Sequence, residues 1–292
     1  MKFVGSLYRV PFDEHRAIAR AAEDAGLDAL ALADHVLHVD ETRSRFPYAE
    51  DGALPWQAED DHPDVWVATA MMAAVTRHLR FLTAVYVLPA REPFGVAKAL
   101  GTLARGSGHR VSFGFGIGWL REEIELMGQR FAGRGRRAEE MLDLIRRLWT
   151  GERVDFAGES YRVEGVRMRP PVGGPIPIVC AGASDAALER AARLGDGWIP
   201  PISVASPEAL EPLLQEIDAR RREGGRSQRA FAVYYTPMAP LDGRELARLE
   251  RMGVTHVFAS PWGFEEAASM PVEEKCARLR EAGRRGLASM VA

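Results

Sequence analysis

One stretch of the sequence indicates the fold most clearly: Val111-Ser112-Phe113-Gly114-Phe115-Gly116-Ile117-Gly118-Trp119-Leu120. Its first half is an apolar, β-rich run typical of a buried strand, and its second half has glycine at alternate positions. Glycines after a strand allow a tight turn and leave backbone N–H groups free to meet ligand oxygens. The stretch lacks the third glycine of the dinucleotide fingerprint and the lysine of a phosphate loop, so it predicts a strand-to-loop site of another kind.

Short apolar runs alternate with amphipathic segments on both sides of this stretch. One such segment has apolar side chains at Ile18, Ala21, Ala22 and Ala25 and ends at Gly26, which is typical of a helix closed by glycine. Another runs from residue 133 to residue 151. Strands that alternate with helices form parallel sheets. We expect eight strands, at residues 2–7, 29–33, 79–85, 110–115, 176–181, 197–200, 230–235 and 256–260.

Eight strand-and-helix units in 292 residues predict a single (β/α)8 TIM barrel spanning residues 1–292, since such barrels have roughly 250 residues. An open, doubly wound sheet is the alternative, because strand order is not visible in a sequence. Two segments break the alternation and are expected as insertions. Residues 37–62 are a candidate lid over the site, and residues 153–175 are expected to form a β-hairpin with a glycine turn.

Composition and charge limit the classes of function. The 38 basic and 41 acidic residues are mixed along the chain and leave a net charge of -3, which provides no basic surface for nucleic acid or an anionic membrane. No apolar run reaches the ~18 residues of a membrane span, and the N-terminus does not resemble a signal peptide, so we expect a cytoplasmic protein. Cys180 and Cys276 are expected as buried thiols, without a disulfide or a metal. The expected partner is a small molecule.

Function in a (β/α)8 barrel resides where strands end, and the second expected strand ends in Asp34-His35. A carboxylate beside an imidazole can hydrogen-bond a heterocyclic ring there and exchange a proton near neutral pH. The alternative is that Asp34 caps the following turn and His35 is an ordinary polar residue. A metal-dependent hydrolase is the weaker interpretation, because His38 lies nearby but no carboxylate cluster completes a metal site.

Two other strand ends carry small residues. The third strand ends near Ala84, where a flat ring can approach the backbone, although small residues also pack in a tapering barrel. The fifth strand ends in Ala181-Gly182-Ala183, before Ser184 or Asp185 as the cap of a helix. Free N–H groups at a helix N-terminus predict an anion site suited to phosphate, with Gly197-Trp198 in the next turn beside it. Such turns also occur for folding reasons alone.

Five motifs, taken in order, resemble the bacterial luciferase-like family and, within it, the branch of oxidoreductases that use the deazaflavin coenzyme F-420. The insertion containing Phe46-Pro47-Tyr48 also resembles that branch. The resemblance covers almost the whole chain and is more specific for fold than for cofactor or substrate. The motifs are Asp34-His35, Leu82-Thr83-Ala84-Val85, residues 107–119 from Ser107 to Trp119, Arg134-Gly135-Arg136-Arg137 with Leu148-Trp149-Thr150-Gly151, and Ala192-Arg193-Leu194-Gly195-Asp196-Gly197-Trp198.

The resemblance implies a flavin-shaped ring at the barrel mouth, packed against a non-proline cis peptide that would be Ala84–Val85 here. It also implies a homodimer. Asp34 and His35 match positions near the polar edge of the ring. The remaining cofactor positions are Gly116, Ile117, Gly118 and Trp119 beside the ring, and Ala181, Gly182, Ala183, Gly197 and Trp198 in the phosphate region.

The activity that the resemblance implies is hydride transfer between F-420 and a small organic substrate. His35 is then the candidate acid or base, Asp34 orients either His35 or the ring, and Tyr48 is a weaker candidate for substrate contact. An FMN-dependent monooxygenase that uses reduced flavin and oxygen is an alternative with the same motifs, as is a flavin-binding protein without turnover. Sugar-phosphate dehydrogenases of the family have glutamate where this chain has Trp119 and lysine where it has Val204, so a glucose-6-phosphate-type reaction is not expected.

Overall fold

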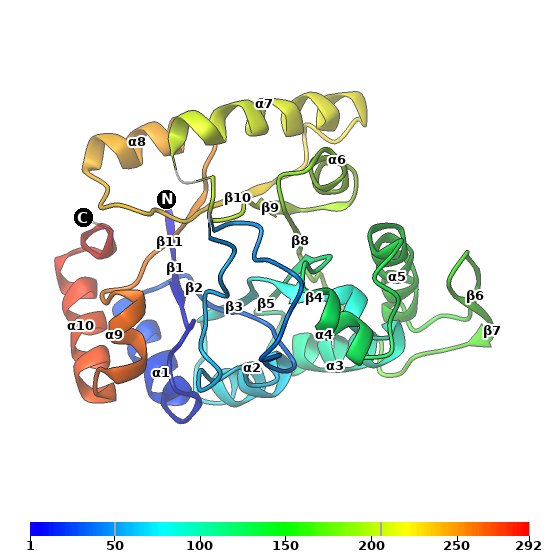
Figure 1. Ribbon diagram of the computed structural model, residues 1–292, viewed down its shortest axis with the longest axis horizontal. Helices are drawn as coiled ribbons and strands as arrows, with labels where there is room; N and C mark the ends of the chain where they lie inside the picture. Colours follow the sequence, from blue (N-terminus) through cyan, green and yellow to red (C-terminus); the bar gives the residue numbers. More distant parts are fainter. Residues whose placement is uncertain (50, 205, 292) are drawn as a thin grey trace.

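Eight parallel strands form the centre of the molecule, with helices around them (Figure 1). The computed structural model describes residues 1–49, 51–204 and 206–291. The eight strands are β1 (Lys2–Ser6), β2 (Ala29–Leu32), β3 (Arg80–Thr83), β5 (Val111–Gly116), β8 (Ile178–Ala181), β9 (Gly197–Ile199), β10 (Ala232–Tyr235) and β11 (His256–Phe258). They close into a barrel, because β1 pairs with both β2 and β11, and β3 pairs with both β2 and β5. Closure confirms the (β/α)8 barrel and rules out the open sheet.

The third strand is the one that differs most from its prediction. The sequence predicts one run over residues 79–85, but β3 ends at Thr83 and a separate short strand, β4 (Tyr86–Val87), follows. β3 pairs with β2 and β5, whereas β4 pairs with the end of β5. The peptide bond between Ala84 and Val85, which lies at this break, is cis as predicted.

The helices cover the outside of the barrel. The helix predicted to end at Gly26 does so, and Gly26 has a φ of 80°, a left-handed conformation that glycine adopts without steric cost. No helix within the described ranges is long and apolar enough to cross a membrane. The long helices are α1 (His15–Ala25), α2 (Val65–Ala73), α3 (Pro93–Gly106), α5 (Arg134–Trp149), α6 (Asp185–Leu194), α7 (Pro207–Glu223), α8 (Gly243–Arg251) and α10 (Val272–Arg285); shorter ones are α4 (Arg121–Leu126), α9 (Phe264–Ser269) and the 3-10 turns Phe12–Glu14, Leu88–Ala90 and Leu287–Met290.

Side chains fill the inside of the barrel. Val4, Ala31, Leu82, Val179 and Tyr234 come from five different strands and form one buried cluster. The alternate residues of the same strands pack outward against the helices, because successive side chains of a strand point to opposite faces. The barrel is therefore a packed core, and a ligand has room only at its ends.

The two predicted insertions lie in different places. Residues 37–62 form no helix or strand among their described residues, and Figure 1 shows this segment crossing the middle of the ring of helices. Glu50, within it, lies outside the described residues. The second insertion contains the predicted hairpin, β6 (Val154–Ala157) paired with β7 (Arg162–Val166), which projects beside α5 at the edge of the molecule. Only the first insertion is placed to cover a site in the barrel.

Candidate functional site

Apolar side chains of modest size line the mouth of the barrel, at the carboxyl ends of its strands. Ala84 and Val85 follow β3, Ile117 follows β5, and Ala181 ends β8. Each of them is half-buried, whereas Leu82, two residues before Ala84, is buried. These residues form a surface against which a flat ligand can rest at the end of the barrel where sites of this fold lie.

Asp34 joins the end of β2 to the segment after the cis peptide. Its carboxylate accepts a hydrogen bond from the backbone N–H of Val87 (2.8 Å) and pairs with the guanidinium of Arg91 (2.7 Å). The side chain of Asp34 is only 3% exposed. Burial raises the pKa of Asp34, while Arg91 and the Val87 N–H act in the opposite direction. The contacts of Asp34 in the structure are thus with Val87 and Arg91, and its role in orienting His35 or the ring stays a prediction.

His35 is held by Glu123, from α4. Its Nδ1 lies 3.0 Å from one oxygen of Glu123, and the other oxygen accepts the N–H of Val36 (2.6 Å). Burial acts to raise the pKa of Glu123, but its hydrogen bonds with His35 and Val36 outweigh this effect and hold the pKa below its usual value. An ionised carboxylate only accepts, so the Nδ1 of His35 carries the hydrogen. Its Nε2 has no hydrogen-bond partner among the described residues and is the atom left for proton exchange.

Aromatic rings from the first insertion surround His35. The ring of Trp56 lies over the imidazole at a tilt of 32°, with 4.1 Å between the ring centroids, and His62 contacts both of these rings edge-on. Trp56 in turn contacts Trp119, from the glycine loop, at 6.0 Å. The insertion therefore lies over His35, as predicted for a lid, and Trp56 connects it to the glycine loop.

Tyr48 lies further out in the same lid. Its ring contacts Phe46 edge-on at 5.3 Å, and Phe46 contacts Trp119 at the same distance. The side chain of Tyr48 remains partly open to solvent, and burial of the rest of the residue raises the pKa of its phenol. Tyr48 is thus connected to the site through Phe46, and its role as a substrate contact stays a prediction.

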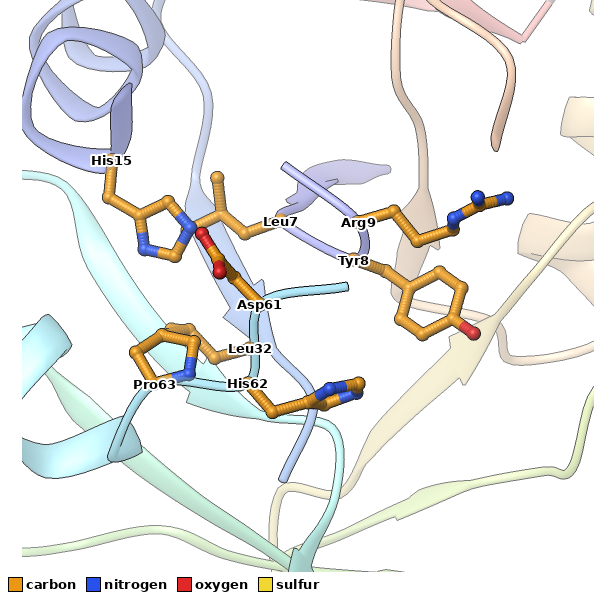
Figure 2. Close-up of a pocket in the computed structure, with 9 residues that line it drawn as sticks. Leu7, Tyr8, Arg9, His15, Leu32, Asp61, His62 and Pro63 are labelled. Carbon is orange, nitrogen blue, oxygen red and sulfur yellow. The ribbon is translucent and has the colours of Figure 1, made fainter. Parts of the chain in front are cut away.

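A small cavity lies next to His62, between the loops after β1 and β2 (Figure 2). The residues that line it include Tyr8, Arg9, Leu32, Asp61 and His62. Its volume of about 10 Å³ corresponds to the space that one water molecule occupies. The cavity by itself is too small for an organic substrate.

The alternating glycines have a packing role that the sequence does not reveal. A Cβ on Gly114 would lie 1.9 Å from the carbonyl oxygen of Thr83, and a Cβ on Gly118 would lie 2.7 Å from the side chain of Val87. Gly118 also has a φ of 73°. Glycine is required at these two positions because β5 and its loop pack closely on the backbone of β3 and on β4. Arg134 holds the loop in place by donating to the Gly118 carbonyl (2.9 Å).

The predicted phosphate region consists of backbone at the start of α6. Ser184, rather than Asp185, is the cap, since its hydroxyl accepts from the N–H of Ala187. Gly182, with a φ of 110°, and the flanking Ala181 and Ala183 are half-buried. The carboxylate of Asp185 pairs with Arg220. Any attraction for an anion at this point therefore comes from the backbone N–H groups.

Gly197 and Trp198, on the neighbouring strand β9, pack against this region. Trp198 is completely buried, and its indole N–H donates to the carbonyl of Gly182 (2.7 Å). Gly197 is also buried, and a Cβ there would lie 2.6 Å from the carbonyl oxygen of Ala232. A buried indole is not accessible to a ligand. The expectation that Trp198 contacts phosphate is therefore corrected to a role in holding the Gly182 turn.

Four residues at the mouth were not predicted from the sequence: Arg91, Glu123, Trp56 and His62. Glu123 closes the segment Arg121-Glu122-Glu123 directly after the glycine loop, which is a signal that points to the site. Trp56 and His62 belong to an insertion without the apolar repeat of a helix or strand, so their places beside His35 are seen only in the folded structure.

Comparison with known proteins identifies the family. A profile of the luciferase-like monooxygenase family matches residues 3–284. An uncharacterised protein of Mycobacterium tuberculosis is 36% identical over 257 residues, covering 88% of each chain. The F-420-dependent glucose-6-phosphate dehydrogenase of Amycolatopsis mediterranei is 31% identical over 185 residues, which are 61% of this chain and 50% of that protein.

The fold comparison agrees. The crystal structure of a monooxygenase from Streptomyces bottropensis superposes with a TM-score of 0.76 at 21% identity, covering 99% of both chains. At this identity the likeness supports the fold alone, whereas the family profile extends over nearly the whole chain. This protein therefore belongs to the luciferase-like monooxygenase family, a family of (β/α)8-barrel enzymes.

Proposed function

We propose that this protein is an oxidoreductase that transfers a hydride between the deazaflavin coenzyme F-420 and a small organic substrate at the barrel mouth. The observation that carries the proposal is His35, at the end of β2. The buried carboxylate of Glu123 holds it, and its Nε2 has no hydrogen-bond partner within the described ranges. Such a histidine is suited to proton exchange. The 31% identity to an F-420-dependent dehydrogenase supports the choice of cofactor.

The residues at the mouth fit a flat ring that carries a phosphate-bearing tail. Ala84 and Val85 are half-buried and apolar, so the face of a ring system can lie against them. The loop from Gly116 to Trp119 would border the ring, and the amides that follow Gly182, whose own N–H donates to Ile199, would hold the phosphate. Nothing larger than a methyl group projects from Ala181, Gly182 or Ala183 to block those amides.

The bound deazaflavin would supply the hydride, and the protein would supply the proton and the environment. Glu123 keeps the hydrogen of His35 on Nδ1, so that Nε2 can take up or release the proton that accompanies hydride transfer. Trp56 covers one face of the imidazole and thereby limits access of water to it. Asp34 and Arg91 fix the backbone of Val87 and with it the segment that follows Val85.

An FMN-dependent monooxygenase is the second candidate. The matching family is described as luciferase-like monooxygenases, and the solved monooxygenase has the same fold over 99% of both chains. The mouth described above offers the same apolar surface and the same helix N-terminus to FMN, since both cofactors have a three-ring system and a phosphate.

Anaerobic turnover distinguishes the two candidates. Reduced F-420 is mixed with the protein and a panel of small enones, imines and ketones without oxygen, and the return of the oxidised deazaflavin absorbance is followed. An F-420 oxidoreductase oxidises the coenzyme with at least one acceptor under these conditions. Substrate conversion that occurs only with reduced FMN and oxygen would instead establish the monooxygenase.

The phosphate region gives a separate prediction. Gly182→Asp should weaken binding of F-420 by tenfold or more, because it places a negative charge against the cofactor phosphate. Gly182→Asn is the matched control, since it introduces nearly the same bulk at the same φ of 110° without charge. Fluorescence titration measures both. Equal affinities for the two variants would mean that the phosphate binds elsewhere, with the loops after β10 and β11 the next candidates.

A further inference from the structure

We propose that the substrate of this site is an uncharged, flat and largely apolar molecule that stacks on Trp119, and that phosphorylated or carboxylated substrates are disfavoured. The inference rests on the proposed function and adds the substrate class to it. Two independent features support it. One is the set of aromatic rings around Trp119, and the other is that the basic side chains near the mouth are already paired with carboxylates or carbonyl groups.

The first feature is an aromatic wall, formed by Phe46, Trp56 and Trp119. Phe46 and Trp56 are 8% and 4% exposed, and each contacts Trp119, at 5.3 Å and 6.0 Å between ring centroids. Trp119 itself is half-buried, so part of its indole remains accessible. Two buried rings hold the third in one orientation, and a fixed, accessible indole favours a flat ligand that can stack on it.

The wall is continuous with the proton-exchanging group. Trp56 contacts Trp119 on one side and lies 4.1 Å from the ring of His35 on the other, measured between centroids. A molecule that stacks on Trp119 therefore lies close to the residue that would exchange its proton. This proximity distinguishes the wall from exposed aromatic side chains elsewhere, such as Phe94 on α3.

The second feature is the absence of lysine from the mouth. The chain has lysine only at positions 2, 98 and 275. Lys2 begins β1 at the opposite end of the barrel, and Lys98 on α3 donates to the carbonyl of Arg169. Lys275 is fully buried in a pair with Glu14. None of the three is placed to receive an anionic group of a substrate.

The arginines near the mouth are already engaged. Arg9 pairs with Asp60 (3.0 Å) and Glu265 (3.1 Å). Arg91 pairs with Asp34, as described above. Arg134 donates to the carbonyl of Gly118 and lies over the ring of Phe131 at 3.7 Å. An anion that displaced Asp34 or Asp60, whose side chains are 3% and 7% exposed, would leave a buried charge unpaired. Glu265, in contrast, is 89% exposed and holds Arg9 only weakly.

Arg43, on the lid, has no ion-pair partner in the part of the chain that the structure describes, and it is exposed, as is Arg45. A solvated cation of this kind attracts an anion only weakly. The carboxylates of Asp34 and Glu123, in contrast, are buried at the mouth and oppose the approach of a negative group. The charges near the site thus favour a neutral substrate, and the wall favours a flat one.

A pair of matched probes tests the proposal. We would titrate the protein with 2-acetylnaphthalene and with 6-acetylnaphthalene-2-sulfonate by calorimetry, with and without F-420. The two probes share a flat ring and a carbonyl group and differ in charge. The neutral probe is expected to bind at least roughly tenfold more tightly. Equal affinity, or tighter binding of the sulfonate, would overturn the proposal.

Variants of Trp119 link the affinity to the wall. Trp119→Leu should weaken binding of 2-acetylnaphthalene by roughly tenfold, whereas Trp119→Phe, which keeps a flat ring, should retain most of it. Phe94→Leu removes an exposed ring from α3 and should leave affinity unchanged. An unchanged affinity in Trp119→Leu, with thermal unfolding like that of the parent protein, would contradict the assignment.

Binding of F-420, measured in the same experiment, separates this inference from the function on which it rests. If F-420 binds but the neutral probe shows no preference, the substrate class is wrong and the proposed function stands. If the neutral probe binds as predicted but F-420 does not, the wall is supported and the cofactor assignment fails.

Discussion

Replacing His35 by asparagine is expected to lower turnover by roughly 10²–10⁴-fold, the contribution of a positioned general acid or base. Asparagine can still hydrogen-bond the carboxylate of Glu123, so the local fold should persist. It has no group that exchanges a proton near neutral pH. Affinity for F-420 should therefore change little. Steady-state kinetics measure the first effect, and fluorescence titration of the cofactor measures the second.

The matched control for this variant is His78→Asn. His78 is exposed and lies just before β3, at the opposite end of that strand from Ala84, and its backbone N–H donates to Glu23. Its replacement should leave turnover within about twofold, as is usual for surface substitutions. Loss of cofactor binding in His35→Asn, in place of lost turnover, would make His35 an anchor for the ring and would remove its role in proton exchange.

Glu123→Gln is expected to lower turnover by roughly 10–100-fold, the loss typical of removing a residue that orients a functional histidine. The carboxylate can only accept, and it therefore fixes the hydrogen of His35 on Nδ1. An amide can turn either its oxygen or its NH₂ group toward His35, so this constraint is lost. Cofactor affinity should again be preserved, because the change lies behind the imidazole.

Glu125→Gln serves as the control on the same helix. Glu125 is half-exposed and pairs with Arg121 at the surface of α4. If Glu125→Gln and Glu123→Gln reduced turnover equally, the effect would come from a general disturbance of α4. If Glu123→Gln had no effect on turnover, the pair that carries the proposed function would have no part in the reaction.

The strands and some of the helices could be predicted because their signals are local. The alternation of apolar runs with amphipathic segments located all eight barrel strands, and Gly26 marked the end of α1. The break after Thr83 could not be seen in the same way, since Leu79 to Val87 is apolar almost throughout. Its cis bond was found through resemblance to a family, which adds information that periodicity does not contain.

The candidate site was only partly predictable because its contacts are long-range. His35 was located at a strand end, but its partner Glu123 lies 88 positions further along the chain. Asp34 was assigned to His35 because the two are adjacent in sequence, whereas the folded strands bring Val87 and Arg91 to its carboxylate.

Trp198 illustrates a second limit. The tryptophan follows a glycine near the predicted phosphate region, but its side chain is completely buried and its indole N–H is bonded to the carbonyl of Gly182. Alternation along a strand decides which side chains face the barrel interior and which face the helices. The bounds of a three-residue strand such as β9 cannot be set closely enough from sequence to make that choice.

A titration with F-420 and with FMN tests the proposal that the barrel mouth binds the deazaflavin F-420. Each oxidised cofactor is added to the protein, and quenching of cofactor fluorescence gives the dissociation constant. We expect F-420 to bind at least roughly tenfold more tightly than FMN, and Gly182→Asp to weaken that binding. Tighter binding of FMN, or no binding of F-420 by a folded protein, would contradict the claim.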